Sequence, residues 1–148
     1  MTESLVTLLC TAYAAEHESL HVIKEYLTAA DDRAVQIRIK EHLVETQWQI
    51  KLLRACMQFQ SIDKDDPDTE FRDISSQINN TDLLAIKRFE IALYKKIIVK
   101  ARKRQSPEVL QACREILGQE IAMAEWIEDN HSKTNRSLSA KRIILSAA

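Results

Sequence analysis

Apolar residues recur every three or four positions along four long segments of this chain, and this spacing is typical of amphipathic helices rather than strands. In the first segment the stripe consists of Leu5, Leu9, Ala12, Glu16, Ser19, Ile23 and Leu27. Many short strands would need frequent turn residues, but the 148-residue chain contains one Gly and two Pro. The spacing and the composition together predict an all-α protein.

Capping residues and breaks in the apolar pattern divide the chain into four helices. Asp31 and Asp32 are N-cap candidates at the start of the second helix. Ser106 followed by Pro107 is typical of the start of another. We expect helices over residues 3–30, 33–60, 82–104 and 107–130, which form one domain, and a tail or short helix over 131–148. The short turns make the helices of each pair antiparallel neighbours in a four-helix bundle.

The connection between the second and third helices is much longer than the other two. Residues 61–80 are acidic, are interrupted by Pro67 and carry no long apolar stripe, although a short helix around 69–78 is expected. A segment of this length can cross the whole bundle, as in folds with one long crossover. We therefore expect the second and third helices to run in the same direction.

Charge and cysteine usage exclude several classes of partner and site. The net charge of −1 gives no electrostatic reason to expect nucleic acid or an anionic membrane as a partner. Cys10, Cys56 and Cys113 are odd in number and widely spaced, which favours buried thiols over disulfides or a zinc site. No apolar run approaches the roughly 20 residues of a spanning helix, and the N-terminus is acidic rather than basic, so a cytoplasmic protein is expected.

Each of the four expected helices carries one glutamate on its apolar stripe. These residues are Glu16, Glu45, Glu90 and Glu120. Glu16 and Glu45 lie equally far from a turn centred between residues 30 and 31, and Glu90 and Glu120 lie equally far from a turn at residue 105. At a rise of about 1.5 Å per residue, each is roughly 22 Å from its turn. All four carboxylates should therefore lie at one level near the middle of the bundle.

Four carboxylates in an apolar interior repel one another unless protons or cations compensate them. A pair of divalent metal ions would do so, and carboxylate oxygen suits iron, manganese or magnesium. His42 lies three residues before Glu45 and shares its helix face, so an imidazole would shift the preference toward iron or manganese. None of Glu45, Glu90 and Glu120 begins a Glu-x-x-His motif, because Trp48, Leu93 and Met123 stand at the histidine position. In the alternative interpretation, the acids are protonated or are paired internally with Arg38 or His42.

Three segments of the chain resemble the YciE/YciF-like stress-response proteins of the ferritin-like superfamily. They are TAYAAEHESL (11–20), EHLVETQWQIKLL (41–53) and RFEIALY (88–94). The resemblance covers most of the chain through the fourth helix. It implies a ferritin-like bundle over residues 1–130 and a homodimer. It also implies metal-ligand roles for Glu16, Glu45, Glu90 and Glu120.

Two functions follow from these patterns. The first is a ferritin-like protein with a two-metal centre of iron or manganese, ligated by Glu16, Glu45, Glu90, Glu120 and His42. Such a centre would perform iron oxidation, or peroxide or dioxygen chemistry. The alternative is a non-catalytic helical scaffold or dimerisation module with a degenerate metal site. The sequence leaves open whether the protein is an enzyme.

Overall fold

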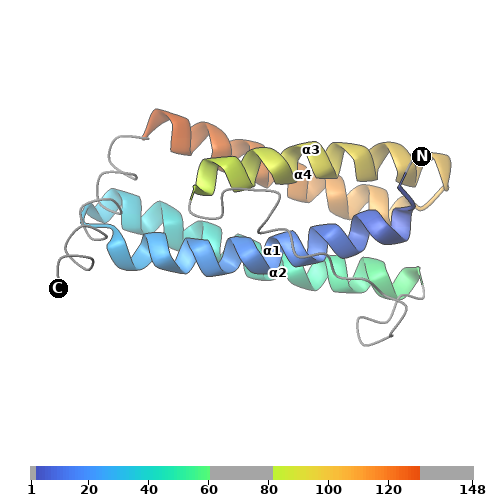
Figure 1. Cartoon of the computed structure of the whole chain (residues 1–148), viewed down its shortest axis with the longest axis horizontal. Coiled ribbons are helices and arrows are strands. Elements are labelled where there is room, and N and C mark those ends of the chain that lie inside the picture. The colour runs from blue at the N-terminus through green and yellow to red at the C-terminus, as the bar shows by residue number, and fades with distance from the viewer. Residues whose placement is uncertain (1–2, 61–81, 131–148) are drawn as a thin grey trace.

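The computed structural model describes residues 3–60 and 82–130, and these residues form a bundle of long α-helices (Figure 1). The helices are α1 (Leu5–Ala29), α2 (Arg33–Phe59), α3 (Leu83–Lys103) and α4 (Pro107–Asp129). Their ends lie within two residues of the expected ones. The prediction of an all-α four-helix bundle is confirmed.

Local sequence explains where the helices begin and how the second turn is made. A side-chain oxygen of Asp32 accepts a hydrogen bond from the Val35 amide at 3.1 Å, and Asp82 accepts one from the Leu84 amide at 3.0 Å. Each bond satisfies an amide that has no partner within its own helix. Gln105, in the turn between α3 and α4, has φ of 54°. This left-handed residue is where the sequence placed the centre of the second turn.

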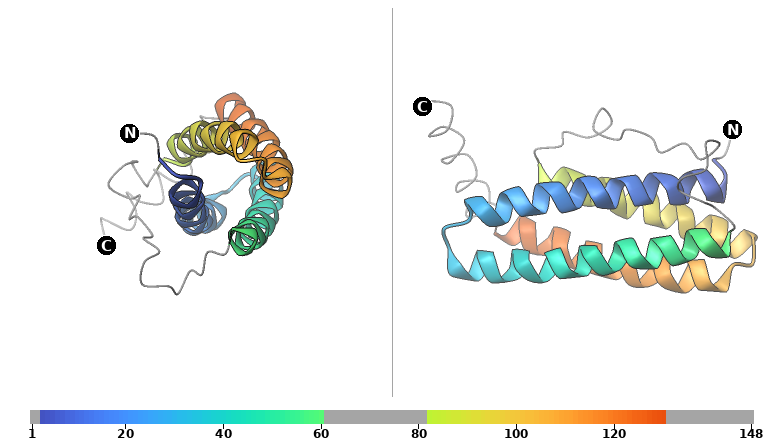
Figure 2. Two further views of the ribbon diagram at one scale, coloured as in Figure 1. Left: turned by 90° about the vertical axis from the view of Figure 1, so that its right-hand side faces the viewer. Right: turned by 90° about the horizontal axis from the view of Figure 1, so that it is seen from below.

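The four helices form a ring in which every helix packs against two others (Figure 2). α1 contacts α2 and α3, and α4 contacts the same two helices. Figure 1 shows α2 and α3 running in the same direction, as predicted from the long connection between them. The connection itself, its expected short helix at 69–78 and the tail at 131–148 lie outside the described residues.

Two apolar clusters occupy opposite ends of the bundle. One includes Leu9, Leu53, Ile97 and Ile116. The other includes Ile23, Ile39, Ile86 and Ile127. Between them lies a polar layer whose side chains expose 0% of their surface: Glu16, Ser19, His42, Thr46, Gln49, Lys87, Glu90 and Glu120. Since burying polar groups costs free energy unless they find partners, this layer is the part of the core that packing alone does not explain.

The described helices contain neither disulfides nor membrane spans. Cys10, Cys56 and Cys113 are free thiols buried in the core. Burial raises the pKa of Cys56 to about 11, so this thiol stays protonated at neutral pH. None of the helices that the structure describes has the length and apolar character needed to cross a membrane.

Candidate metal centre

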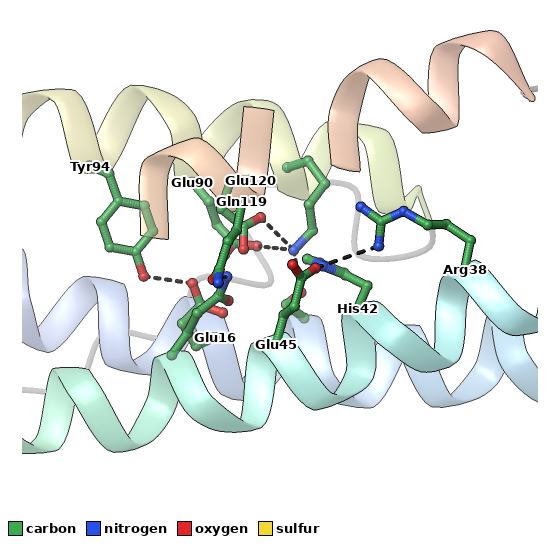
Figure 3. Close-up of polar contacts among 11 residues, drawn as sticks. Glu16, Arg38, His42, Glu45, Glu90, Tyr94, Gln119 and Glu120 are labelled. Atoms are coloured by element: carbon green, nitrogen blue, oxygen red, sulfur yellow. Dashed lines mark hydrogen bonds and ion pairs between the residues drawn. The ribbon is translucent and has the colours of Figure 1, made fainter. Parts of the chain in front are cut away.

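Three glutamates from three different helices meet in the polar layer (Figure 3). Glu16 comes from α1, Glu90 from α3 and Glu120 from α4. One carboxylate oxygen of each lies within 4.8 Å of the corresponding oxygen of the other two. We refer to Glu16, Glu90 and Glu120 as the three-acid group. Its members come from the positions that the spacing of the helix stripes and turns predicted.

The fourth glutamate, Glu45, is bound to two neighbours on its own helix and does not join this group. Its Oε1 atom lies 2.9 Å from Nδ1 of His42 and 3.5 Å from a guanidinium nitrogen of Arg38. The Glu45 side chain is 30% exposed, whereas that of His42 is fully buried. The internal pairing that the sequence left open as an alternative is therefore present at Glu45.

A buried lysine, which the sequence analysis did not identify, lies against the three-acid group. Nζ of Lys87 is 2.7 Å from Oε2 of Glu120 and 3.2 Å from Oε1 of Glu90. The same nitrogen donates a hydrogen bond to Oγ of Ser19 at 2.9 Å. Lys87 follows Leu83 by four residues and precedes Glu90 by three, so its spacing does place it on the inner stripe of α3.

Several ligand atoms of the polar layer have no hydrogen-bond partner. Glu16 accepts a 2.6 Å hydrogen bond from the Tyr94 hydroxyl at Oε1, but its Oε2 atom has no hydrogen-bond partner. Oε2 of Glu90, Oε1 of Glu120 and Nε2 of His42 are also buried without one. Buried polar atoms in native proteins are nearly always satisfied, so these lone pairs point to a ligand or a functional role.

Burial and mutual repulsion raise the pKa of every member of the three-acid group. Burial, followed by the charge of Glu120, raises the pKa of Glu16 to about 7. Burial, followed by the charge of Glu90, raises the pKa of Glu120 to about 7. The pKa of Glu90 is raised well above its ordinary value by burial and by the charge of Glu16. Glu16 and Glu120 therefore titrate near neutral pH, and burial favours the protonated form of Glu90.

The charges of the acids keep Lys87 protonated in spite of its burial. Burial alone lowers the pKa of an ammonium group, but the nearby carboxyls of Glu120, Glu90 and Glu16 outweigh it, and the pKa of Lys87 is raised. The group is thus a set of acids compensated by one internal cation.

His42 is neutral, and its hydrogen bond determines which nitrogen carries the proton. Burial, followed by the charge of Lys87, lowers the pKa of His42 to about 3. The hydrogen bond from His42 is the main cause of a lowered pKa at Glu45, so this carboxylate is ionised and can only accept. The proton must then sit on Nδ1, and the unpartnered Nε2 carries a lone pair.

A four-helix bundle with one long crossover and with carboxylates from several helices at its centre has the architecture of the ferritin-like proteins. The chain belongs to the family described as a domain of unknown function, DUF892, whose model matches residues 1–84 and 75–139. It is also similar to the crystal structure of a protein from Xanthomonas campestris pv. campestris, with a TM-score of 0.73 and 27% sequence identity. That similarity covers 93% of this chain and 94% of the other. The comparison with curated proteins gave no significant match.

Proposed function

We propose that this chain is a metal-binding ferritin-like protein that holds one iron(II) or manganese(II) ion in the three-acid group. The observation that carries this proposal is the approach of three buried carboxylate oxygens from three helices to within 4.8 Å of one another. Carboxylate oxygen is a hard ligand suited to divalent iron, manganese or magnesium. A divalent ion would also offset the burial and the repulsion that raise the pKa values of these acids.

His42 is not among the residues whose ligand atoms meet within 4.8 Å, so in this proposal it would join the ion only as an additional ligand, whose nitrogen would favour iron or manganese over magnesium. Its Nε2 atom is buried and unprotonated, as a metal-binding imidazole must be. Glu45 then acts on His42 rather than on the metal, because a carboxylate that accepts the other ring proton fixes the orientation of the imidazole. The sequence favoured two ions. The geometry favours one, because Glu45 is already paired with His42 and Arg38.

The surrounding residues suit redox chemistry that requires a dry site. A bound iron ion would supply one-electron chemistry with peroxide or dioxygen, in keeping with the resemblance to YciE/YciF-like stress-response proteins. Tyr94 would hold Glu16 in place through its 2.6 Å hydrogen bond. The apolar clusters on both sides of the polar layer would exclude water. A cytoplasmic location remains a prediction from the sequence.

Metal titration of the full-length protein tests this function. Metal-free protein mixed with iron(II) under nitrogen, or with manganese(II), should bind about one equivalent and melt at a higher temperature, since ligand binding stabilises the native state. Glu120→Gln should abolish binding, whereas Glu125→Gln, an exposed position on the same helix, should not. The absence of bound metal, together with unchanged melting, would contradict the proposal.

The outer face of α2 supports a second candidate function, that of a dimerisation module. Four large apolar side chains on this helix are at least half exposed: Ile37 (51%), Val44 (60%), Trp48 (50%) and Phe59 (62%). At 100° per residue they fall within an arc of about 60°, so they form one stripe. We call these four residues the α2 stripe. The exposed Glu41 also lies within this arc, between Ile37 and Val44, and interrupts the apolar face there. An exposed apolar stripe on a helix is still typical of a protein–protein contact.

The occupant that we propose for the α2 stripe is a second copy of the chain, which would bury the α2 stripes of both copies against each other. This agrees with the homodimer that the family resemblance implies. Light scattering after gel filtration should show a dimer for the wild-type protein and a monomer for Trp48→Glu. Val99→Glu, at a 51% exposed position on α3, serves as the control and should leave the dimer intact. A monomeric wild-type protein would rule out this second function.

A further inference from the structure

Lys87 lies against two of the three acids that would bind the proposed metal, Glu90 and Glu120. Its ammonium nitrogen contacts side chains from three helices: Ser19 on α1 at 2.9 Å, Glu90 on α3 at 3.2 Å and Glu120 on α4 at 2.7 Å. The lysine exposes 0% of its surface, so no water replaces any of these contacts from outside. Within the polar layer of the described helices, Lys87 is the only side chain with a permanent positive charge.

The ammonium group and a divalent ion compete for the same oxygen atoms. A divalent ion binds carboxylate oxygen at about 2.0–2.2 Å. An ion bound to Oε2 of Glu120 would lie no more than about 5 Å from the Lys87 nitrogen in its observed position, given the 2.7 Å contact. Two cations at this separation in a buried site repel strongly. Movement of the ammonium away from Glu120 would therefore favour metal binding.

The side chain of Lys87 is suited to such an exchange. Its four-carbon stem is flexible, and its compact ammonium makes single contacts rather than the paired contacts of a guanidinium. Two of the acids keep an oxygen available for metal, since Oε2 of Glu90 and Oε1 of Glu120 have no hydrogen-bond partner. The lysine is thus the residue whose position decides whether the acids are available.

We propose that Lys87 is an internal cation that competes with divalent metal for the three-acid group and thereby sets the metal affinity of this protein. This inference rests on the proposed function, because it assumes that the same three acids bind metal. It assigns to Lys87 a regulatory role. In the metal-free protein Lys87 compensates the negative charge of the acids, and metal binds by displacing the lysine side chain.

Manganese(II) titration of the full-length protein tests the competition. Lys87→Met removes the charge and keeps an unbranched side chain, so it should bind manganese(II) at least about tenfold more tightly than the wild type, a difference of about 1.4 kcal/mol. Lys96→Met, at an exposed position on the same helix, should bind like the wild type. Affinities are measured by isothermal titration calorimetry, with circular dichroism to verify that each variant is folded.

A second variant keeps the test valid if Lys87→Met does not fold. Ser19→Ala removes a neutral hydroxyl that accepts the 2.9 Å hydrogen bond from Lys87 and leaves all three acids in place. Loss of one hydrogen bond weakens the hold on the ammonium, so manganese(II) affinity should rise about fivefold.

The possible results separate this inference from the function on which it rests. Equal manganese(II) affinity in the wild type and in a folded Lys87→Met or Ser19→Ala variant overturns the competition and leaves metal binding by the acids intact. Weaker binding in Lys87→Met also overturns it. If neither the wild type nor a folded Lys87→Met variant binds manganese(II), the proposed function fails and the inference fails with it.

Discussion

The ammonium nitrogen of Lys87 lies 2.7 Å from Oε2 of Glu120, and neither side chain exposes any surface to solvent. This ion pair links α3 to α4 at the level where the two apolar clusters separate. A buried pair of this kind adds little net stability, because the attraction is offset by the loss of hydration of both groups. Removing only one partner, however, leaves the other uncompensated, and this asymmetry leads to the first prediction.

Lys87→Met should strongly destabilise the metal-free protein. Loss of the ammonium leaves Glu90 and Glu120 without their cation, and breaking a buried pair typically lowers the free energy of unfolding by about 3–5 kcal/mol. Urea unfolding at pH 7 in the presence of a chelator measures the change. Lys96→Met, an exposed control on the same helix, should change the free energy of unfolding by no more than about 0.5 kcal/mol. Equal stability of the two variants would show that the acids do not need the lysine.

Glu120→Gln should destabilise the metal-free protein less at pH 8 than at pH 5, relative to the wild type at the same pH. The pKa of Glu120 is raised from 4.5 to about 7 in the native state, so the native state binds more protons than the unfolded state between these values. The contribution of Glu120 to the free energy of unfolding of the wild type therefore falls as pH rises from about 4.5 to about 7. Glutamine does not titrate, so the variant shows no such fall. Melting temperatures of both proteins at pH 5 and pH 8 measure the effect. A difference between them that is independent of pH would argue against the raised pKa.

Tyr94→Phe should destabilise the protein by about 1–3 kcal/mol, the usual cost of leaving a buried acceptor without its donor. The Tyr94 hydroxyl is the donor to Oε1 of Glu16, at 2.6 Å, and both side chains are fully buried. Chemical denaturation measures the change. Tyr13→Phe is the matched control, since the Tyr13 hydroxyl accepts a longer, 3.2 Å hydrogen bond from Arg54 in a partly exposed setting. A larger loss in the control would indicate that Glu16 does not depend on Tyr94.

Glu45→Ala should weaken manganese(II) binding by about 10- to 100-fold, the usual effect of removing a carboxylate that orients a metal-binding imidazole. Oε1 of Glu45 lies 2.9 Å from Nδ1 of His42, so its loss frees the ring to rotate and to exchange its proton between the two nitrogens. Isothermal titration calorimetry measures the affinity, and ¹⁵N NMR of the imidazole reports which nitrogen is protonated. Glu41→Ala, at an exposed position on α2, should affect neither measurement. A protonated Nε2 in the wild-type protein would remove the basis of this prediction.

The three-acid group could be predicted from the sequence because helices and tight turns have regular geometry. Glu16, Glu90 and Glu120 lie on inner stripes at nearly equal numbers of residues from their turns. Because the rise per residue of a helix is constant, the three side chains reach the same level of the bundle. The turn itself was placed at Gln105, where the structure has its left-handed residue.

Lys87 could not be predicted in the same way, although it lies on an inner stripe. A single lysine in an apolar stripe usually extends its charged end to solvent. Only the approach of acids from α1 and α4, which are distant in sequence, makes a fully buried ammonium favourable at this position. The burial of Lys87 therefore depends on contacts with other helices, which the spacing of residues along α3 does not indicate.

The spacing of His42 and Glu45 along α2 does not determine which of the two side chains points into the bundle, whereas the orientation of the helix does. His42 and Glu45 are three residues apart, and either could point to the centre. In the structure the imidazole is fully buried, while the carboxylate lies at the edge beside Arg38 with 30% of its side chain exposed. A neutral imidazole costs less to bury than a charged carboxylate, and this difference explains the choice.

The separation of the core into two apolar clusters by the polar layer has a consequence for the alignment of the helices. A shift of α1, α3 or α4 along its neighbours by a single turn, about 5.4 Å, would move a carboxylate or the Lys87 ammonium into one of the apolar clusters. The displaced charge would lose its partner in an apolar surrounding, which is among the most costly events in a protein interior. We therefore expect the polar layer to fix the relative heights of α1, α3 and α4, even if it adds nothing to the stability of the bundle.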